Sequence, residues 1–229
     1  MEFAYVHENV AAIRLSIEAA CAKAGRDPAD VRVIAVTKTA PPDIVPALAA
    51  AGVRDAAENR WQAAREKLEH QASALLTWHF IGTLQTNKVK YIAPRFDWIH
   101  SVDRLELAVA LAQAAERAGR TLNVLMQVNV AQESQKHGFA PEICLEAARA
   151  IAGMPSLALR GLMTMAPQVD DPELARPVFR ALRELRDDVR ARLSLAAFDE
   201  LSMGMSQDYP IAIEEGATMV RIGRRLVNP

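Results

Sequence analysis

The sequence predicts an α/β fold, a single (β/α)8 barrel of the TIM type that spans residues 1–229. Eight short apolar segments alternate with helical segments, which is typical of parallel sheets. Several strand candidates, such as VIAV and VLMQVNV, are almost continuously apolar, as expected for strands covered on both faces. No linker rich in proline, glycine or serine divides the chain. An open doubly wound sheet is the alternative, but the glycine-rich turn that usually follows its first strand is absent after VIAV.

The chain begins with a predicted helix over residues 5–24, in which apolar residues recur at helical spacing until a glycine ends it. The first strand candidate, VRVIAV, follows at 31–36. Two prolines at 41–42 then predict the start of a helix that runs through Ala51, because proline is tolerated in a first helical turn. Such an immediate helix would place Lys38 on a short, firm turn.

Seven further strand candidates follow, and each of the first six leads into a helical segment. They are residues 55–59 (helix about 61–70), 75–82 (helix near 85–92), 96–102 (helix 104–119), 122–130 (helix 141–153), 157–165 (helix 172–193), 198–204 (helix 206–216) and 217–223. Little sequence follows the last strand. We therefore expect the extra N-terminal helix to occupy the place of the eighth barrel helix.

The charge balance and the cysteines exclude several classes of protein. Lysine and arginine number 27, against 28 aspartate and glutamate residues. A partner such as nucleic acid or an anionic membrane requires a basic field, so we expect neither. Cys21 and Cys144 are too few and too far apart for a disulfide scaffold or a CxxC motif. The charged N-terminal segment lacks an apolar run of signal-peptide or membrane-spanning length, so a cytoplasmic protein is expected.

Polar residues gather where the predicted strands end. In barrels of this kind the carboxyl ends of the strands form the rim that carries the active site. The strand-end residues are Lys38, Glu58, Asn59, His79, Gly82, His100, Ser101, Asn129, Met163 to Met165, Ser202 to Ser206, and Arg221 to Gly223. Any one of them could be an ordinary strand end, but eight converging ends indicate a pocket.

Lys38 is the only lysine among these strand ends. Partial burial at a barrel mouth disfavours the ammonium form of a lysine, and a neutral amine can attack a carbonyl to form a Schiff base. The alternative is a side chain that extends its charged end into water. Taken with the other strand ends, the sequence favours the reactive amine.

The segment LSMGMSQDYPIAIEEG, residues 201–216, has the features of a phosphate-binding loop. Gly204 permits a tight turn, and Ser206 offers a hydroxyl and is expected to cap the next helix, whose free N–H groups would attract an anion. Phosphate sites in barrels often use the loops after strands seven and eight, and residues 221–223 would supply the second half. Arg221 could instead approach a ring nitrogen. Taken alone, the motif is equally consistent with a capped helix beside a surface arginine.

Other chemistries are not indicated. The five histidines form no HxxxH pair and have no neighbouring ligand set, so no metal site is expected. The chain contains no GxSxG, GxxxxGK[ST] or GxGxxG motif. Nucleophile-elbow hydrolases and the common nucleotide-binding loops are therefore disfavoured.

Several motifs together carry a resemblance to a known family. They are AVTK (35–38), EN with Gln62 (58–62), WHFIGTLQTNK (78–88), IHSVDR (99–104), QVNVAQESQKHG (127–138), GLM (161–163), LSMGMSQDY (201–209), AIxxGxT (212–218) and VRIG (220–223). In these motifs the chain resembles the pyridoxal phosphate homeostasis proteins, which are barrels that bind pyridoxal 5'-phosphate (PLP) and are related to the N-terminal domain of alanine racemase. The resemblance covers residues 8–223 and implies PLP fold type III without the C-terminal β-domain.

The resemblance implies a PLP site with a Schiff base at one lysine. The implied cofactor-binding residues are Lys38 (Schiff base), Asn59, His79 and Met203 (pocket lining), Gly204, Ser206, Ile222 and Gly223 (phosphate), Arg221 (pyridine nitrogen) and Lys136 (a second lysine that could take PLP in transfer). An arginine keeps the pyridine nitrogen unprotonated, which weakens the cofactor as an electron sink. That property suits a carrier or a poor catalyst.

Two segments depart from the family pattern. Ala56 and Ala57 stand where the family has an aromatic residue and a glycine, and Arg224 replaces a small residue beside the expected phosphate loop. The tail also lacks the phenylalanine-glycine motif of the family. Arg224 could add a charged contact to the phosphate or disturb the loop.

The expected function is PLP binding for intracellular PLP homeostasis without a committed reaction, with PLP-dependent apoenzymes as candidate partners. The first alternative is a PLP-dependent amino-acid racemase, although its second base would come from a β-domain that this chain is too short to include. The second alternative is an aldolase-like barrel that uses Lys38 on a sugar carbonyl without PLP. The sequence leaves open whether PLP is delivered, scavenged or sensed, and whether the protein is a monomer or a weak homodimer.

Overall fold

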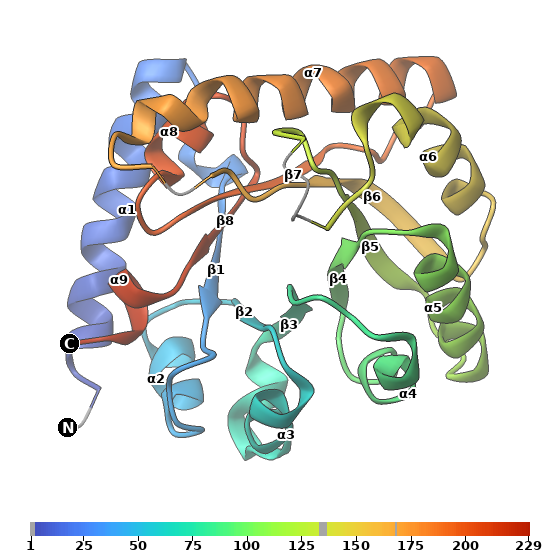
Figure 1. Cartoon of the computed structure of the whole chain (residues 1–229). Helices are drawn as coiled ribbons and strands as arrows, with labels where there is room; N and C mark the ends of the chain where they lie inside the picture. Colours follow the sequence, from blue (N-terminus) through green and yellow to red (C-terminus); the bar gives the residue numbers. More distant parts are fainter. Residues whose placement is uncertain (1–2, 133–136, 168) are drawn as a thin grey trace.

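Eight parallel strands close into a barrel in the computed structural model, which describes residues 3–132, 137–167 and 169–229. The strands follow one another in chain order, and β8 pairs with β1 to close the sheet (Figure 1). They are β1 (Arg32–Val36), β2 (Asp55–Glu58), β3 (Thr77–Phe80), β4 (Trp98–Val102), β5 (Leu122–Gln127), β6 (Leu157–Met163), β7 (Glu200–Met205) and β8 (Met219–Ile222). The predicted barrel is thereby confirmed, and the open sheet is excluded because no strand of it is left as an edge.

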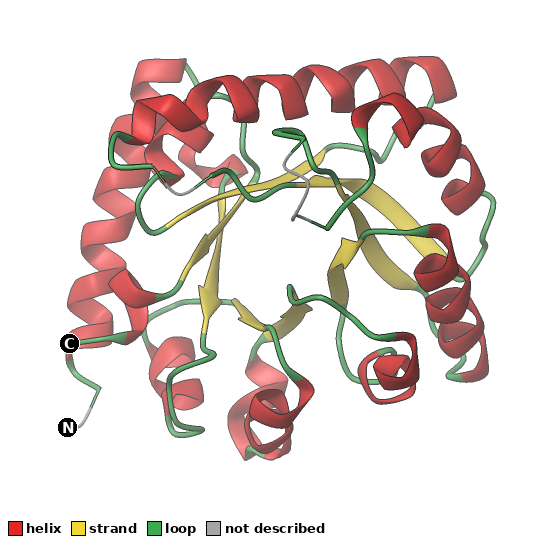
Figure 2. Ribbon diagram, in the orientation of Figure 1, coloured by secondary structure: helices red, strands yellow, loops and turns green. Residues whose placement is uncertain are grey.

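Helices surround the barrel and alternate with the strands (Figure 2). They are α1 (Tyr5–Ala24), α2 (Ile44–Ala50), α3 (Trp61–Glu69), α4 (Val89–Ile92), α5 (Leu105–Arg117), α6 (Cys144–Ala152), α7 (Arg176–Leu193), α8 (Tyr209–Glu214) and α9 (Arg224–Val227). The first helix has the predicted bounds and ends at Gly25, whose φ of 63° is the left-handed conformation that glycine adopts readily. Among the described residues, no helix is both long enough and apolar enough to cross a membrane.

Helix α1 completes the ring of helices, as predicted. It lies beside α8 and α9 along one side of the barrel (Figure 1). The Tyr5 hydroxyl donates to the carbonyl of Val227 at 3.0 Å, and Asn9 Nδ2 donates to the carbonyl of Asn228 at 2.8 Å. At its other end, the Lys23 ammonium lies 3.4 Å from a Glu214 carboxylate oxygen. The apolar face of α1 is thereby buried in the position of an eighth barrel helix.

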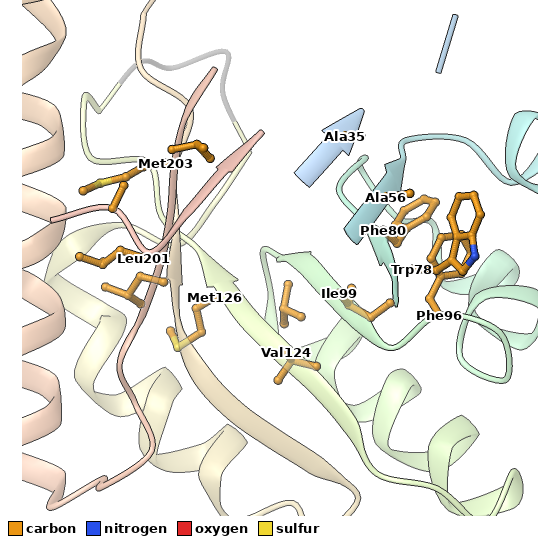
Figure 3. Close-up of a cluster of buried hydrophobic side chains, with 14 of the residues drawn as sticks. Ala35, Ala56, Trp78, Phe80, Phe96, Ile99, Val124, Met126, Leu201 and Met203 are labelled. Carbon is orange, nitrogen blue, oxygen red and sulfur yellow. The ribbon is translucent and has the colours of Figure 1, made fainter. Parts of the chain in front are cut away.

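The core consists of two layers, one on each face of the sheet. The outer layer fills the space between strands and helices and includes Phe80, Ile99 and Met126 (Figure 3). A smaller cluster fills the inside of the barrel; its members are Ile34, Val36, Ala57, Trp98, Leu125, Met163 and Met219. The strands are apolar on both faces because both of these layers must exclude water.

The predicted start of the second helix is wrong. Helix α2 begins at Ile44, and the two prolines precede it in a turn closed by N–H donation from Ile44 to the carbonyl of Pro41 at 3.1 Å. A residue that precedes proline is disfavoured in the helical region, so Pro41 cannot belong to a helix that continues through Pro42. The segment between β1 and α2 is therefore longer than the short turn expected around Lys38.

Candidate functional site

Lys38 lies in the turn after β1, at the carboxyl end of the barrel. The residue before it, Thr37, is fully buried, and its N–H donates to the carbonyl of Ala57 on β2 at 3.0 Å. The side chain of Lys38 itself is exposed. We expected a partly buried amine from the sequence, and this was wrong because the chain leaves the sheet after Thr37 and enters an exposed turn.

A buried ion pair lies directly behind this turn. The ammonium of Lys67, on α3, is 2.6 Å from Glu58 Oε1 at the end of β2, and both side chains are almost completely buried. Lys67 Nζ also donates to the carbonyl of Thr37 at 2.8 Å, and the Thr37 hydroxyl donates to Glu58 Oε1 at 2.6 Å. The pair therefore holds the carbonyl of the peptide bond that joins Thr37 to Lys38. This role is not recognisable from the sequence, because Lys67 is one of several charged residues in an amphipathic helix.

Arg221, in β8, is a buried guanidinium inside the barrel. It is 4% exposed. Its Nη1 donates to Ser202 Oγ at 2.7 Å, and its Nη2 donates to the carbonyl of Thr164 at 2.9 Å. Burial lowers the pKa of Arg221 to about 10, and the nearby carboxylate of Asp208 opposes this shift. The side chain is thus still cationic at neutral pH, and it has N–H groups beyond the two that these carbonyl and hydroxyl oxygens accept.

Two histidines extend the Arg221–Ser202 hydrogen bond into a series of contacts across the barrel interior. His100 Nδ1 is 2.8 Å from Ser202 Oγ, although β4 and β7 are not neighbours in the sheet, so the contact crosses the interior. His100 Nε2 is 2.9 Å from His79 Nδ1, and His79 Nε2 is 2.9 Å from Asp55 Oδ1. His79, predicted as pocket lining, is fully buried within this chain of contacts. Sequence reasoning placed both histidines on the rim but missed Asp55, which is simply the first residue of β2.

Burial keeps both histidines neutral. It lowers the pKa of His79, against the opposing effect of the hydrogen bond to Asp55. It lowers the pKa of His100 well below the ordinary value, and the nearby His79 and Arg221 lower it further. An imidazolium in this interior would lose its hydration and face a guanidinium. Neither ring is therefore charged near neutral pH.

Acid is expected to destabilise the protein through these two histidines. Well above pH 6.5 both histidines are neutral in the folded and in the unfolded chain. As the pH falls through about 6.5, the histidines of the unfolded chain bind protons and those of the folded chain do not. The free energy of unfolding therefore decreases as the pH falls. Between pH 7.5 and 5.5 the loss is expected to reach about 1.4 kcal/mol for His100, whose pKa lies well below its ordinary value, and to be smaller for His79, where Asp55 opposes the shift. Urea unfolding at the two pH values, compared between the parent protein and His100→Gln, measures it. The variant should lose less stability in acid, whereas His7→Gln, at an exposed site, should behave as the parent; an unchanged loss in His100→Gln would contradict this origin.

The last residues of β7 are tightly packed against α8. Gly204 has a φ of 89°, and a Cβ there would lie 2.6 Å from the Ala212 Cβ, so only glycine fits. Ser206 was expected to cap the next helix, which is wrong: α8 begins at Tyr209, and Ser206 lies in a turn before it. Asp208 closes that turn, because its Oδ1 accepts from the N–H of Met205 at 2.6 Å.

The ends of three neighbouring strands bring the predicted amine, arginine and phosphate loop together. In the sheet, Met205 pairs with Arg221 and Ala35 pairs with Ile222. Ser206, Gly223 and Lys38 therefore follow adjacent strands at the carboxyl end. A Cβ at Gly223 would lie 3.6 Å from Val36 Cβ and from the Val36 carbonyl oxygen, which is ordinary van der Waals contact, so this backbone packs against the end of β1. Gly223 and Ser206 are both half-buried.

The remaining predicted site residues differ in their placement. Asn59 is half-buried just after β2, and its carbonyl lies against Gly82, where a Cβ would be 2.1 Å from that oxygen. Met203 packs in the outer core beside Leu201, on the helix side of β7 (Figure 3), so its side chain does not line the barrel interior. Successive residues of a strand face opposite sides, and Ser202 takes the inner one. Lys136 lies outside the described residues.

The two departures from the family pattern affect this site differently. Ala56 packs in the outer core and Ala57 in the inner cluster, and both are fully buried. Their small side chains therefore complete two existing apolar layers. Arg224 is exposed at the start of α9, and Arg225 next to it lies over the ring of Tyr209, 5.8 Å from its centroid. Arg225 Nη1 lies 3.5 Å from the Ser206 carbonyl oxygen, so its guanidinium adds positive charge beside this turn.

Other parts of the molecule are weaker candidates than the strand ends for a ligand or metal site. A cavity of about 350 Å³ lies at the opposite end of the barrel, between α1 and the amino ends of β1 and β2, and Arg14 and Asp55 are among its lining residues. In barrels of this kind the amino-terminal face serves stability. Within the described ranges, no three histidine, cysteine or acidic side chains are grouped so that they could hold a metal ion.

The donor set at the three strand ends fits PLP. An aldehyde needs a primary amine, which Lys38 supplies. A pyridine nitrogen is an acceptor, which suits a buried guanidinium with spare N–H groups. A phosphate needs backbone and hydroxyl donors, and the half-buried Gly223 and Ser206, which follow adjacent strands, can supply a backbone N–H and a hydroxyl. The residues present therefore match the three functional groups of the cofactor.

Sequence comparisons identify relatives over nearly the whole chain. A family model described as "Alanine racemase, N-terminal domain" matches residues 9–227. A pyridoxal phosphate homeostasis protein of Pseudomonas aeruginosa is 44% identical over 221 residues, which are 96% of this chain and 94% of that protein. A protein of the same name from Aquifex aeolicus is 41% identical over 219 residues, 96% of each.

Solved structures of similar fold include a protein determined with PLP bound and an alanine racemase. PipY of Synechococcus elongatus PCC7942, determined with PLP bound, is 32% identical and superposes with a TM-score of 0.85 over 97% of this chain and all of that one. Alanine racemase of Clostridium difficile 630 is 16% identical, with a TM-score of 0.72 over 96% of this chain and 56% of the racemase. At that identity the racemase shows the fold alone.

Proposed function

The chain belongs to the pyridoxal phosphate homeostasis proteins, a family with the alanine racemase N-terminal domain, and on this basis we propose that it binds PLP on Lys38 and serves intracellular PLP homeostasis. The observation that carries the proposal is the arrangement at the ends of β7, β8 and β1. There Ser206 follows β7, the buried Arg221 lies in β8 with Gly223 directly after that strand, and Lys38 follows β1. Each matches one functional group of PLP.

In this proposal every residue of the site has a distinct role. When bound, PLP supplies an aldehyde that joins the Lys38 amine as a Schiff base. Arg221 donates to the pyridine nitrogen. The phosphate is held by the Ser206 hydroxyl and by backbone N–H groups near Gly204 and at Ile222 and Gly223. Asn59 borders the site at the end of β2, and Met203 contributes through its backbone because its side chain is in the outer core.

The arginine favours a carrier over a catalyst. A guanidinium that donates to the pyridine nitrogen leaves that nitrogen without a proton, and such a ring withdraws electrons weakly. The proposal is therefore that the protein holds and releases PLP without a committed reaction. PLP-dependent apoenzymes are the proposed recipients, the cytoplasm is the proposed compartment, and a monomer or weak homodimer is the proposed state. The racemase alternative has less support, because the racemase likeness extends only to the fold.

Reversible loading tests this proposal. Purified protein is incubated with PLP, dialysed, and examined for visible absorbance; the loaded protein is then mixed with the apo form of a PLP-dependent enzyme, and separately with L-alanine. We expect a Schiff-base absorbance that survives dialysis and recovery of activity in the apoenzyme, with no D-alanine formed. Failure to bind PLP would overturn the proposal in favour of the aldolase-like alternative, and D-alanine at ordinary enzymatic rates would overturn it in favour of the racemase.

A further inference from the structure

A hydrogen-bonded chain crosses the barrel interior and ends on Arg221. It begins at Asp55 on β2, passes through His79 on β3 and His100 on β4, and reaches Ser202 on β7 before the guanidinium on β8. Every link is between 2.7 and 2.9 Å. None of the five residues is more than 7% exposed. The chain has an anion at one end and a cation at the other.

One arrangement of the protons satisfies every donor and acceptor along these five side chains. A guanidinium only donates, so Ser202 Oγ accepts from Arg221. If the serine proton goes to His100 Nδ1, then His100 carries its own proton on Nε2 and donates to His79 Nδ1. His79 then carries its proton on Nε2 and donates to the Asp55 carboxylate. Each neutral ring accepts once and donates once, and every link is satisfied.

The reverse arrangement is unfavourable. It would place the His100 proton on Nδ1 and the His79 proton on Nδ1, and a bare His79 Nε2 would face Asp55 Oδ1 at 2.9 Å. Two acceptors at that distance repel, and a buried carboxylate that lacks a donor pays its full desolvation cost. An ionised Asp55 therefore selects one tautomer of His79, which in turn selects the tautomer of His100 and the direction of the serine hydroxyl.

We propose that Asp55, His79 and His100 are positioning residues that act on Arg221 through Ser202. The histidines hold the serine proton away from the guanidinium, so that Ser202 presents only lone pairs to Arg221 and fixes Nη1. The carbonyl of Thr164 fixes Nη2 in the same way. Because Nη1 and Nη2 are both held, the remaining N–H groups of Arg221 keep one orientation. The inference rests on the proposed function in one respect, namely that those N–H groups face the pyridine nitrogen.

The proton positions on the two histidines can be observed directly, and they test the proposed hydrogen-bond order from Asp55 to Arg221 without any cofactor. Nitrogen-15 NMR of the cofactor-free protein at pH 7.5 reports which ring nitrogen of His79 and His100 carries the proton. We expect the Nε2–H tautomer at both residues. An Nδ1–H tautomer or an imidazolium at either one would overturn the proposal. Because the measurement uses the parent protein without PLP, it stands whether or not the proposed function is correct.

The positioning role needs a second measurement, which compares ligands with and without a ring nitrogen. Affinities for PLP and for its 1-deaza analogue, in which carbon replaces that nitrogen, give a preference ratio that depends on the Arg221 contact. We expect Ser202→Ala and Asp55→Asn to lower this ratio by about five- to tenfold, the equivalent of one lost hydrogen bond. Asp97→Asn is the matched control, because Asp97 accepts from Arg120 and from the N–H of Trp78 outside the chain.

The outcomes separate the two proposals. A ratio lowered in Ser202→Ala and Asp55→Asn but retained in Asp97→Asn supports the positioning role, since a general loss of stability would weaken both ligands alike. An unchanged ratio in Ser202→Ala would overturn that role even if the tautomers are as expected. Should Asp55→Asn fail to fold, the Ser202→Ala ratio and the parent tautomers still decide. Absence of binding by either ligand in the parent would overturn the proposed function and, with it, the role of the chain at the ring nitrogen.

Discussion

Replacing Lys38 by alanine is expected to abolish covalent attachment of PLP. No other residue of the strand ends at β7, β8 and β1 carries a primary amine, so the variant has no group there that could form a Schiff base. The free energy of unfolding of the cofactor-free protein should change by less than about 0.5 kcal/mol, because the side chain is exposed. Borohydride reduction of the loaded protein, followed by mass measurement of the intact chain, checks the first point, and urea unfolding checks the second.

Two further variants make this experiment specific. Lys38→Arg keeps the positive charge but not the amine, and it should also fail to retain PLP after reduction. Lys90→Ala removes an exposed lysine on α4 and should retain it. Mass added to Lys38→Ala after reduction would show that another lysine forms the bond. A loss of covalent PLP in Lys90→Ala as well would point to a general effect rather than to Lys38.

Replacing Lys67 by methionine is expected to cost about 3–5 kcal/mol of stability, the usual cost of leaving a buried charge without its partner. Glu58 would remain fully buried with an uncompensated carboxylate, and its Oε2 already lacks a hydrogen-bond partner among the described residues. Urea unfolding of the cofactor-free variant measures the effect. PLP affinity should fall as well, since Lys67 holds the carbonyl of the Thr37–Lys38 peptide bond.

The same helix offers a matched comparison. Arg65 forms an exposed i,i+4 pair with Glu69, with the guanidinium 3.1 Å from the carboxylate, and Arg65→Met should cost no more than about 0.5 kcal/mol. Removing both buried charges in Glu58→Leu/Lys67→Met should recover most of the stability lost in Lys67→Met. If Lys67→Met and Arg65→Met were equally stable, the buried pair would have no structural importance. If the double variant regained stability but not PLP affinity, the pair would act mainly on Lys38.

The strand order and the rim of polar residues could be predicted from the sequence, but the face on which each side chain lies could not. A strand such as VIAV is apolar on both faces, so its sequence does not show which residues face the barrel interior and which face the helices. Met203 and Ser202 were both candidates for the pocket, and only the structure shows that the serine faces inward and the methionine outward. Amphipathic helices have the same ambiguity for charged residues, which is why Lys67 was not recognised. Such a residue is recognisable only once its partner on β2 is known.

The location of α1 has a consequence for how the protein folds during synthesis. Its hydrogen bonds join Tyr5 to Val227, residues separated by 222 positions, and β1 likewise completes its pairing only with β8. The nascent chain therefore emerges from the ribosome with the apolar face of its first helix uncovered until β8 and α9 have been translated. Contacts of such long sequence separation slow folding, because the loop that they close loses much entropy before the contacts form. Closure of the ring is thus a late event, during which chaperones would find the apolar face of α1 still exposed.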